Sequence, residues 1–156
     1  MQTMRGENGK DNNYMEISAF EKQMKYLSDN NYYYPSWDEV YQFVQNKKTL
    51  PKKSVVITIH SHDMHRAGKD RFLTMTHDEA YNDLMTTQKI IGSNDVFCYP
   101  YGDYNDFTKK MLKATGYKLA LTTRSGRVYP GMDKLALPRL RMSKGDPLSY
   151  FIARVK

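Results

Sequence analysis

Three of the four histidines of the chain stand close together, in the segment His60-Ser61-His62-Asp63-Met64-His65. Neutral imidazole nitrogens are suited to zinc and its neighbouring transition metals, and two or three nearby histidines can share one ion. A separation of five residues on an irregular loop lets two rings turn toward one point, so the pattern indicates a metal site. The alternative is a polar loop whose histidines are exposed and bind nothing.

A second candidate segment is the turn Pro100-Tyr101-Gly102-Asp103, which follows a predicted strand at residues 95–99. The histidine segment also follows a predicted strand, the short β-branched run from Ser54 to Ile59. In parallel sheets, reacting groups lie at the carboxyl ends of the strands. Both segments therefore begin where such a fold carries its chemistry. A plain strand-to-helix turn is the alternative for the second segment, because Pro-x-Gly sequences are common there.

The elements that must position these segments alternate between helix and strand. Capping boxes at Ser18 to Glu21, Ser36 to Glu39 and Thr76 to Glu79 predict three helix starts, and Asn105 and Asp146-Pro147 predict two more. The predicted strands cover residues 54–59, 95–99, 117–122 and 135–142, the last one interrupted by Pro138. Such an alternation predicts βαβ units and a mostly parallel sheet.

At the histidine segment the sequence resembles the second motif of the polysaccharide deacetylases, the NodB-homology group known as carbohydrate esterase family 4. In that family a pair of histidines follows a strand and binds the catalytic metal. The serine after the first histidine and the following Asp-x-His resemble the poly-N-acetylglucosamine deacetylase branch. The resemblance implies that His60 and His65 are metal ligands and that the ion is zinc or another divalent transition metal.

The likeness continues from about Ile17 to the end of the chain. Residues 97–105 resemble the family's third motif, with Cys98 where many members have an arginine. The resemblance implies that the backbone amide of Tyr101 helps to hold the oxyanion. Residues 116–123 and 137–142 resemble the later strands, and Arg139 is a candidate for ordering the site, with a surface or structural ion pair as its alternative role. The implied fold is α/β, the distorted (β/α) barrel of the NodB type.

One part of the family's pattern is missing from the sequence. The strand before the histidine motif should run into Asp-Asp-Gly, whose first aspartate is the general base and whose second is the third metal ligand. Here Ile59 is followed at once by His60, so neither aspartate stands between Thr58 and His60 and no general base is evident. Reaching the histidine motif normally takes another helix and strand, roughly 30 residues. Either the gene carries an internal deletion or residues are missing here, and we expect an incomplete barrel. Asp63 is a candidate substitute ligand.

Two functions follow from the resemblance. The first is a metal-dependent hydrolase that removes N-acetyl groups from a cell-wall or extracellular N-acetylglucosamine polymer, such as poly-N-acetylglucosamine, peptidoglycan or a chitin-like chain. The second is a catalytically inactive, truncated relative that at most binds glycan, and the missing aspartates favour it directly. A carboxylate close to His60 and His65 would distinguish the two.

The composition bears on the partners. The formal charge is +7 and the chain has 13 tyrosines. Lysine and arginine are spread along the chain without a nucleic-acid-binding motif, so we expect no nucleic acid as partner and infer attraction to an anionic wall or surface. Amphipathic tyrosine rings often line carbohydrate contacts, and packing at the edge of the core is their alternative role.

The length of 156 residues predicts one domain. We expect residues 1–16 to form a polar lead-in and residues 17–156 the deacetylase-like domain. The single cysteine, Cys98, excludes an intrachain disulfide. Residues 1–13 do not resemble a signal peptide and no segment is long enough to span a membrane, although the resemblance implies an extracellular or cell-surface location. An incomplete barrel exposes an open sheet edge and apolar faces, so we expect marginal stability or self-association.

Overall fold

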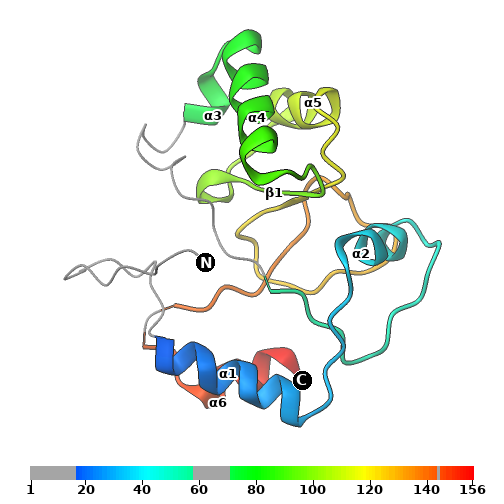
Figure 1. The fold of residues 1–156 in the computed structure, drawn as a ribbon, viewed down its shortest axis with the longest axis vertical. Helices are drawn as coiled ribbons and strands as arrows, with labels where there is room; N and C mark the ends of the chain where they lie inside the picture. The colour runs from blue at the N-terminus through cyan, green and yellow to red at the C-terminus, as the bar shows by residue number, and fades with distance from the viewer. Residues whose placement is uncertain (1–16, 58–70, 144) are drawn as a thin grey trace. The chain divides into compact units, whose positions relative to one another are not determined.

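The computed structural model describes residues 17–57, 71–143 and 145–156, which form two compact units. The first unit is drawn from residues 17–34, 51–55 and 141–156, and the second from residues 35–50, 56–57 and 71–140. The elements are, in chain order, α1 (Ile17–Asp29), α2 (Trp37–Val44), α3 (Arg71–Thr74), α4 (His77–Ile91), β1 (Val96–Cys98), the 3₁₀ turn η1 (Pro100–Gly102), α5 (Asp106–Ala114), β2 (Leu119–Leu121) and α6 (Leu148–Val155) (Figure 1).

The first unit is built on α1 and α6, which lie side by side (Figure 1). Leu27 of α1 and Phe151 of α6 are buried together with Tyr32. The ring of Tyr26 meets that of Phe151 edge-on, with centroids 6.4 Å apart. Apolar residues of two helices distant in sequence therefore form one small core.

Of the two predicted helix starts in this unit, the first is wrong, and the second is correct in position but lacks a side-chain cap. Helix α1 already includes Ile17, so Ser18 lies inside the helix and does not cap it. Helix α6 has Pro147 as its N-cap, without a side-chain hydrogen bond. The carboxylate of Asp146 instead accepts a hydrogen bond from the backbone amide of Ser143, 2.6 Å away. The preceding turn thus uses the oxygen that was expected to cap the helix.

The β-branched run predicted as a buried strand is not a regular strand in its described part, residues 54–57. Ser54 forms a single bridge with Tyr33, and two backbone bonds flank it: Tyr33 N–H to Lys53 O at 2.8 Å and Val55 N–H to Tyr33 O at 2.9 Å. The chain passes from the first unit to the second between Val55 and Val56, so the run is shared between two cores. Residues 58 and 59 lie outside the described part.

The second unit contains a parallel pair of strands, and this confirms the expected α/β class. Strands β1 and β2 pair in the register Val96 with Leu119, Phe97 with Ala120 and Cys98 with Leu121. All three residues of β2 are buried. Helix α4 packs against α5, and Figure 1 shows both close to β1. The fully buried Leu84 and Leu112 lie on these helices and share one core with β1.

Local signals predicted three helix starts correctly. Ser36 caps α2, Thr76 caps α4 and Asn105 caps α5, and each forms a complete capping box. Gly92 ends α4 with a left-handed φ of 74°. A side-chain oxygen at an N-cap satisfies backbone amides that the helix leaves without partners, so a short sequence pattern is enough to mark the position.

The strand predicted at residues 135–142 is reduced to one bridge, which pairs Leu137 with Leu121 in parallel. Pro138 follows, and proline has no backbone N–H to extend the ladder. The next backbone bond is donated by Arg139 to the carbonyl of Arg124, 2.9 Å away. The segment is therefore a second, very short parallel partner of β2, after β1.

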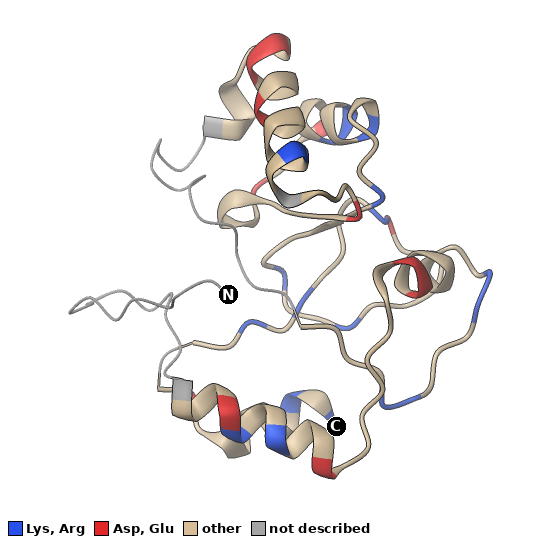
Figure 2. Ribbon diagram, in the orientation of Figure 1, with Lys and Arg blue, Asp and Glu red and all other residues tan. Residues whose placement is uncertain are grey.

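Within the described ranges, no helix is both long enough and apolar enough to cross a membrane. Among the described residues, Figure 2 shows lysine and arginine on α1, α4, α5 and α6 and on several loops. The expected boundary between residues 1–16 and 17–156 and the expected self-association stay predictions.

Candidate functional site

The candidate site lies where the parallel segments of the second unit end. β1 ends at Cys98, β2 ends at Leu121, and Leu137 is bridged to Leu121. Because these segments run in the same direction, the residues that follow them lie at one edge of the sheet. Those residues are η1, the segment 122–124 and the pair Pro138-Arg139. The two described residues predicted for the site, Tyr101 and Arg139, are therefore brought to the same edge.

Tyr101 has an unusual backbone conformation. Its φ is 55° and its ψ is −2°, in the left-handed region that side-chain-bearing residues occupy rarely. The turn is closed by Gly102 N–H to Tyr99 O at 2.9 Å and by Asp103 N–H to Pro100 O at 3.2 Å. The carbonyl of Tyr101 accepts a hydrogen bond from the hydroxyl of Thr123 at 3.0 Å. Such conformations cost about 1–3 kcal/mol and occur often at functional sites. The oxyanion role of the Tyr101 amide stays a prediction.

Arg139 bonds to the backbone of the segment after β2. Its Nε donates to the carbonyl of Thr122 at 2.8 Å, and its own amide donates to the carbonyl of Arg124 at 2.9 Å. The hydroxyl of Thr122 in turn donates to the carbonyl of Leu137 at 3.1 Å. These bonds hold residues 122–124 against the end of the sheet. They are the kind of contact that would let Arg139 order a site, and that role also stays a prediction.

Cys98 is half-buried at the end of β1. Burial raises the pKa of its thiol, and the nearby positive charge of Arg139 offsets only part of that effect. The thiol is therefore neutral at physiological pH and is no candidate nucleophile. A half-buried cysteine at this position packs as a small apolar group.

A buried tyrosine supports the start of η1. Tyr99 is fully buried, and its hydroxyl donates to the carbonyl of Leu135 at 3.0 Å. Its ring stacks on that of Tyr104, with centroids 5.2 Å apart. The ammonium group of Lys109 lies 4.9 Å from the centre of the Tyr104 ring and pairs with Asp133 at 2.5 Å. The turn that carries Tyr101 thus begins from a buried, well-packed residue.

Sequence reasoning missed the residues that join Tyr101 to Arg139. Thr122 ends the predicted strand at residues 117–122 and Thr123 and Arg124 follow it directly, and that position was the available signal. Threonine after a strand is common and has no distinctive spacing, so it did not stand out.

The predicted metal ligands His60 and His65, and the candidate substitute Asp63, lie outside the described residues. The part of the chain that the structure does describe contains no group of three or more His, Cys, Asp or Glu residues suited to an ion. Two imidazoles are chemically suited to zinc, but catalytic zinc sites use three protein ligands. The two histidines alone are therefore one ligand short of such a site, with Asp63 as the candidate third ligand.

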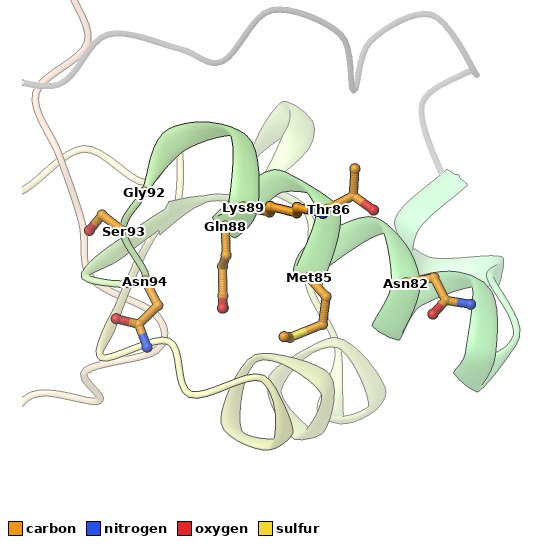
Figure 3. Close-up of a pocket in the computed structure, with 8 residues that line it drawn as sticks. All are labelled: Asn82, Met85, Thr86, Gln88, Lys89, Gly92, Ser93 and Asn94. Carbon is orange, nitrogen blue, oxygen red and sulfur yellow. The ribbon is translucent and has the colours of Figure 1, made fainter.

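An open hollow of about 660 Å³ lies elsewhere in the second unit (Figure 3). Its lining includes Asn82 and Met85 of α4, and Ser93 and Asn94 of the following loop. Ser93 and Asn94 precede β1, whereas the candidate site follows β1. The hollow therefore lies toward the amino ends of the strands, away from the predicted chemistry.

Comparison with known proteins gives one curated relative and several similar structures. No profile of a known protein family matches the chain. Over 61 residues the chain is 36% identical to the Bacillus subtilis (strain 168) protein named "Putative polysaccharide deacetylase YxkH". That match covers 39% of this chain and only 22% of the relative's length.

The fold is similar over almost the whole chain to solved deacetylases. The Streptococcus pyogenes deacetylase PplD, solved in complex with acetate, matches with a TM-score of 0.72 and 19% identity, over 99% of this chain and 94% of PplD. BC0361, a polysaccharide deacetylase from Bacillus cereus, matches with a TM-score of 0.65 and 16% identity, over 99% of this chain and 66% of BC0361. The chain therefore has the fold of the polysaccharide deacetylases, and its resemblance to that family is confirmed.

Proposed function

We propose that the chain is a metal-dependent deacetylase that removes N-acetyl groups from a cell-wall or extracellular N-acetylglucosamine polymer. The observation that carries the proposal is the position of the Tyr101 turn and of the segment held by Arg139, both at the carboxyl edge of the parallel strands. The similarity to YxkH and the fold shared with PplD and BC0361 support the same reaction class.

In this proposal each group has one role in amide hydrolysis. Water adds to the acetamide carbon, the C–N bond breaks, the amine nitrogen takes a proton, and acetate leaves. The amide of Tyr101 donates a hydrogen bond to the carbonyl oxygen as negative charge develops on it. His60 and His65 would hold the divalent ion, whose chemistry when bound is to polarise the carbonyl and activate the water. The Asp-Asp pair that would supply the general base and the third metal ligand does not stand before His60.

A second candidate function is glycan binding by an inactive relative. The specific observation in its favour is the direct succession of Ile59 and His60, which leaves no Asp-Asp pair after the preceding strand. Without a general base, proton transfer from the attacking water is not assisted, and such assistance typically contributes 10²–10⁴-fold in rate.

Zinc titration by calorimetry tests the metal-dependent part of the proposal. The comparison uses the wild-type chain, the double variant His60→Ala/His65→Ala and the control His77→Ala. His77 is exposed in the first turn of α4, where its ring stacks on that of Tyr81. We expect stoichiometric binding by the wild type and the control, and loss of binding in the double variant. Equal binding by all three proteins would contradict the ligand assignment.

The reaction itself is tested by acetate release from N-acetylglucosamine oligomers, with zinc added or removed by a chelator. Zinc-dependent release that the double variant loses supports the deacetylase. Retention of the oligomers on the protein without any acetate release supports the inactive, glycan-binding relative instead.

A further inference from the structure

We propose that Thr123 is a positioning residue that, together with Gly102, fixes the direction of the Tyr101 backbone amide. The contribution of this contact to catalysis rests on the proposed function, whereas its geometry does not. Thr123 is the second residue after the end of β2, and Tyr101 lies in the turn after β1. The contact therefore joins the two strand ends that carry the candidate site.

The two segments approach each other more closely than most side chains would permit. Gly102 has a φ of 84°, and a Cβ atom at this position would lie 2.1 Å from the Thr123 hydroxyl oxygen and 2.5 Å from the Thr123 nitrogen. The second of these atoms belongs to the backbone and cannot turn aside. Glycine is therefore required here both for its conformation and for the close approach.

The hydrogen bond from Thr123 is made to Tyr101 itself, the residue whose amide is proposed to hold the oxyanion. The Thr123 hydroxyl donates to the carbonyl oxygen of Tyr101 at 3.0 Å. Only the torsions φ and ψ separate this carbonyl from the Tyr101 N–H, and both are set to the left-handed values of 55° and −2°. Holding the carbonyl thus opposes a return of Tyr101 to the more favourable right-handed region.

The donor is itself held in place. The amide of Thr122 donates to the carbonyl of Leu137 at 2.9 Å, and Arg139 Nε donates to the carbonyl of Thr122 at 2.8 Å. These bonds attach the residue before Thr123 to the neighbouring parallel segment. A donor fixed to the sheet can define the position of the turn, whereas a donor on a loose loop would follow it.

Nuclear magnetic resonance tests the geometry without reference to activity. The proteins are the uniformly ¹⁵N-labelled wild type, Thr123→Val, Thr123→Ala, Thr123→Ser and the control Thr86→Val on the exposed face of α4. Removing the hydroxyl should shift the Tyr101 amide resonance and speed exchange of the Gly102 amide about 5- to 10-fold. Thr123→Ser should restore both, and Thr86→Val should change neither. Unchanged Tyr101 shift and Gly102 exchange in the Val and Ala variants would overturn the proposal.

Steady-state kinetics of acetate release test whether the hydrogen bond from Thr123 to Tyr101 contributes to catalysis. In an active chain we expect Thr123→Val to lower kcat about 10- to 100-fold with KM changed less than about 2-fold, and Thr123→Ser to recover most of kcat. An unchanged kcat in Thr123→Val would overturn the positioning role. If the wild type releases no acetate, the proposed function fails, and the resonance measurements alone decide on the contact between Thr123 and Tyr101.

Discussion

Replacing Tyr99 by phenylalanine should destabilise the protein while leaving its fold unchanged. The hydroxyl of Tyr99 is fully buried and donates to the carbonyl of Leu135 at 3.0 Å. Phenylalanine keeps the ring packing against Phe97, Phe72 and Tyr104 but removes this donor. A lost hydrogen bond costs about 1 kcal/mol, and a buried acceptor that loses its donor raises the cost to about 1–3 kcal/mol. We expect the free energy of unfolding to fall by that amount near neutral pH.

The same substitution should change how stability depends on alkaline pH. Burial, reinforced by the negative charge of Asp133, raises the pKa of the Tyr99 hydroxyl. Unfolded tyrosine loses its proton near pH 10, where folded Tyr99 still holds it. Above that pH the unfolded state binds fewer protons than the folded state, so the free energy of unfolding decreases as pH rises. One such group contributes a slope of up to about 1.4 kcal/mol per pH unit. Tyr99→Phe should lack this contribution.

Urea unfolding between pH 7 and pH 11 measures both effects. The matched control is Tyr129→Phe, because Tyr129 is 58% exposed and lies in a loop. The control should match the wild type at all pH values within about 0.5 kcal/mol. Burial also raises the pKa of Tyr117, so some alkaline slope should remain in Tyr99→Phe. If Tyr99→Phe had wild-type stability at pH 7 and the wild-type slope above pH 10, the reasoning would be refuted.

Two further substitutions test the core and one cap. Leu112→Ala should lower the free energy of unfolding by about 2–5 kcal/mol, because Leu112 is fully buried in the core beside β1. The control Ile90→Ala, at a 79% exposed position, should change it little. Equal effects of the two substitutions in urea unfolding would contradict the core assignment. Ser36→Ala should cost about 1 kcal/mol, since the Ser36 hydroxyl accepts from the Glu39 amide at 3.2 Å. Thermal unfolding should show recovery in Ser36→Asp, and no recovery there would argue against the cap.

The sequence was sufficient to predict a structural feature wherever that feature depends on residues close together in the chain. The capping boxes at Ser36, Thr76 and Asn105 each join residues three positions apart, so the pattern of side chains identifies the helix start. Gly92 ends a helix because it adopts a left-handed φ at little cost. The order of short motifs along the chain was also enough to indicate the deacetylase fold. The ligand roles of His60 and His65 stay predictions.

Local reasoning failed where strand formation depends on distant partners. Residues 54–57 have strand-forming side chains, yet they have one bridge, to Tyr33. Residues 135–142 have a suitable apolar pattern, yet only Leu137 pairs, and Pro138 follows it. A strand exists only when a second segment supplies its hydrogen bonds, and the sequence of one segment does not specify that partner.

The sequence by itself determined the helix starts at Ser36, Thr76 and Asn105 and the parallel α/β class, and it indicated the turn that carries Tyr101. The tertiary structure alone decided which residues meet at the carboxyl edge of the strands. Thr123 contacts Tyr101 across 22 positions, Arg139 contacts Thr122 across 17, and Tyr99 reaches Leu135 across 36. These contacts depend on the register of β1 on β2 and on the bridge at Leu137, because a shift of one residue would turn each side chain to the other face.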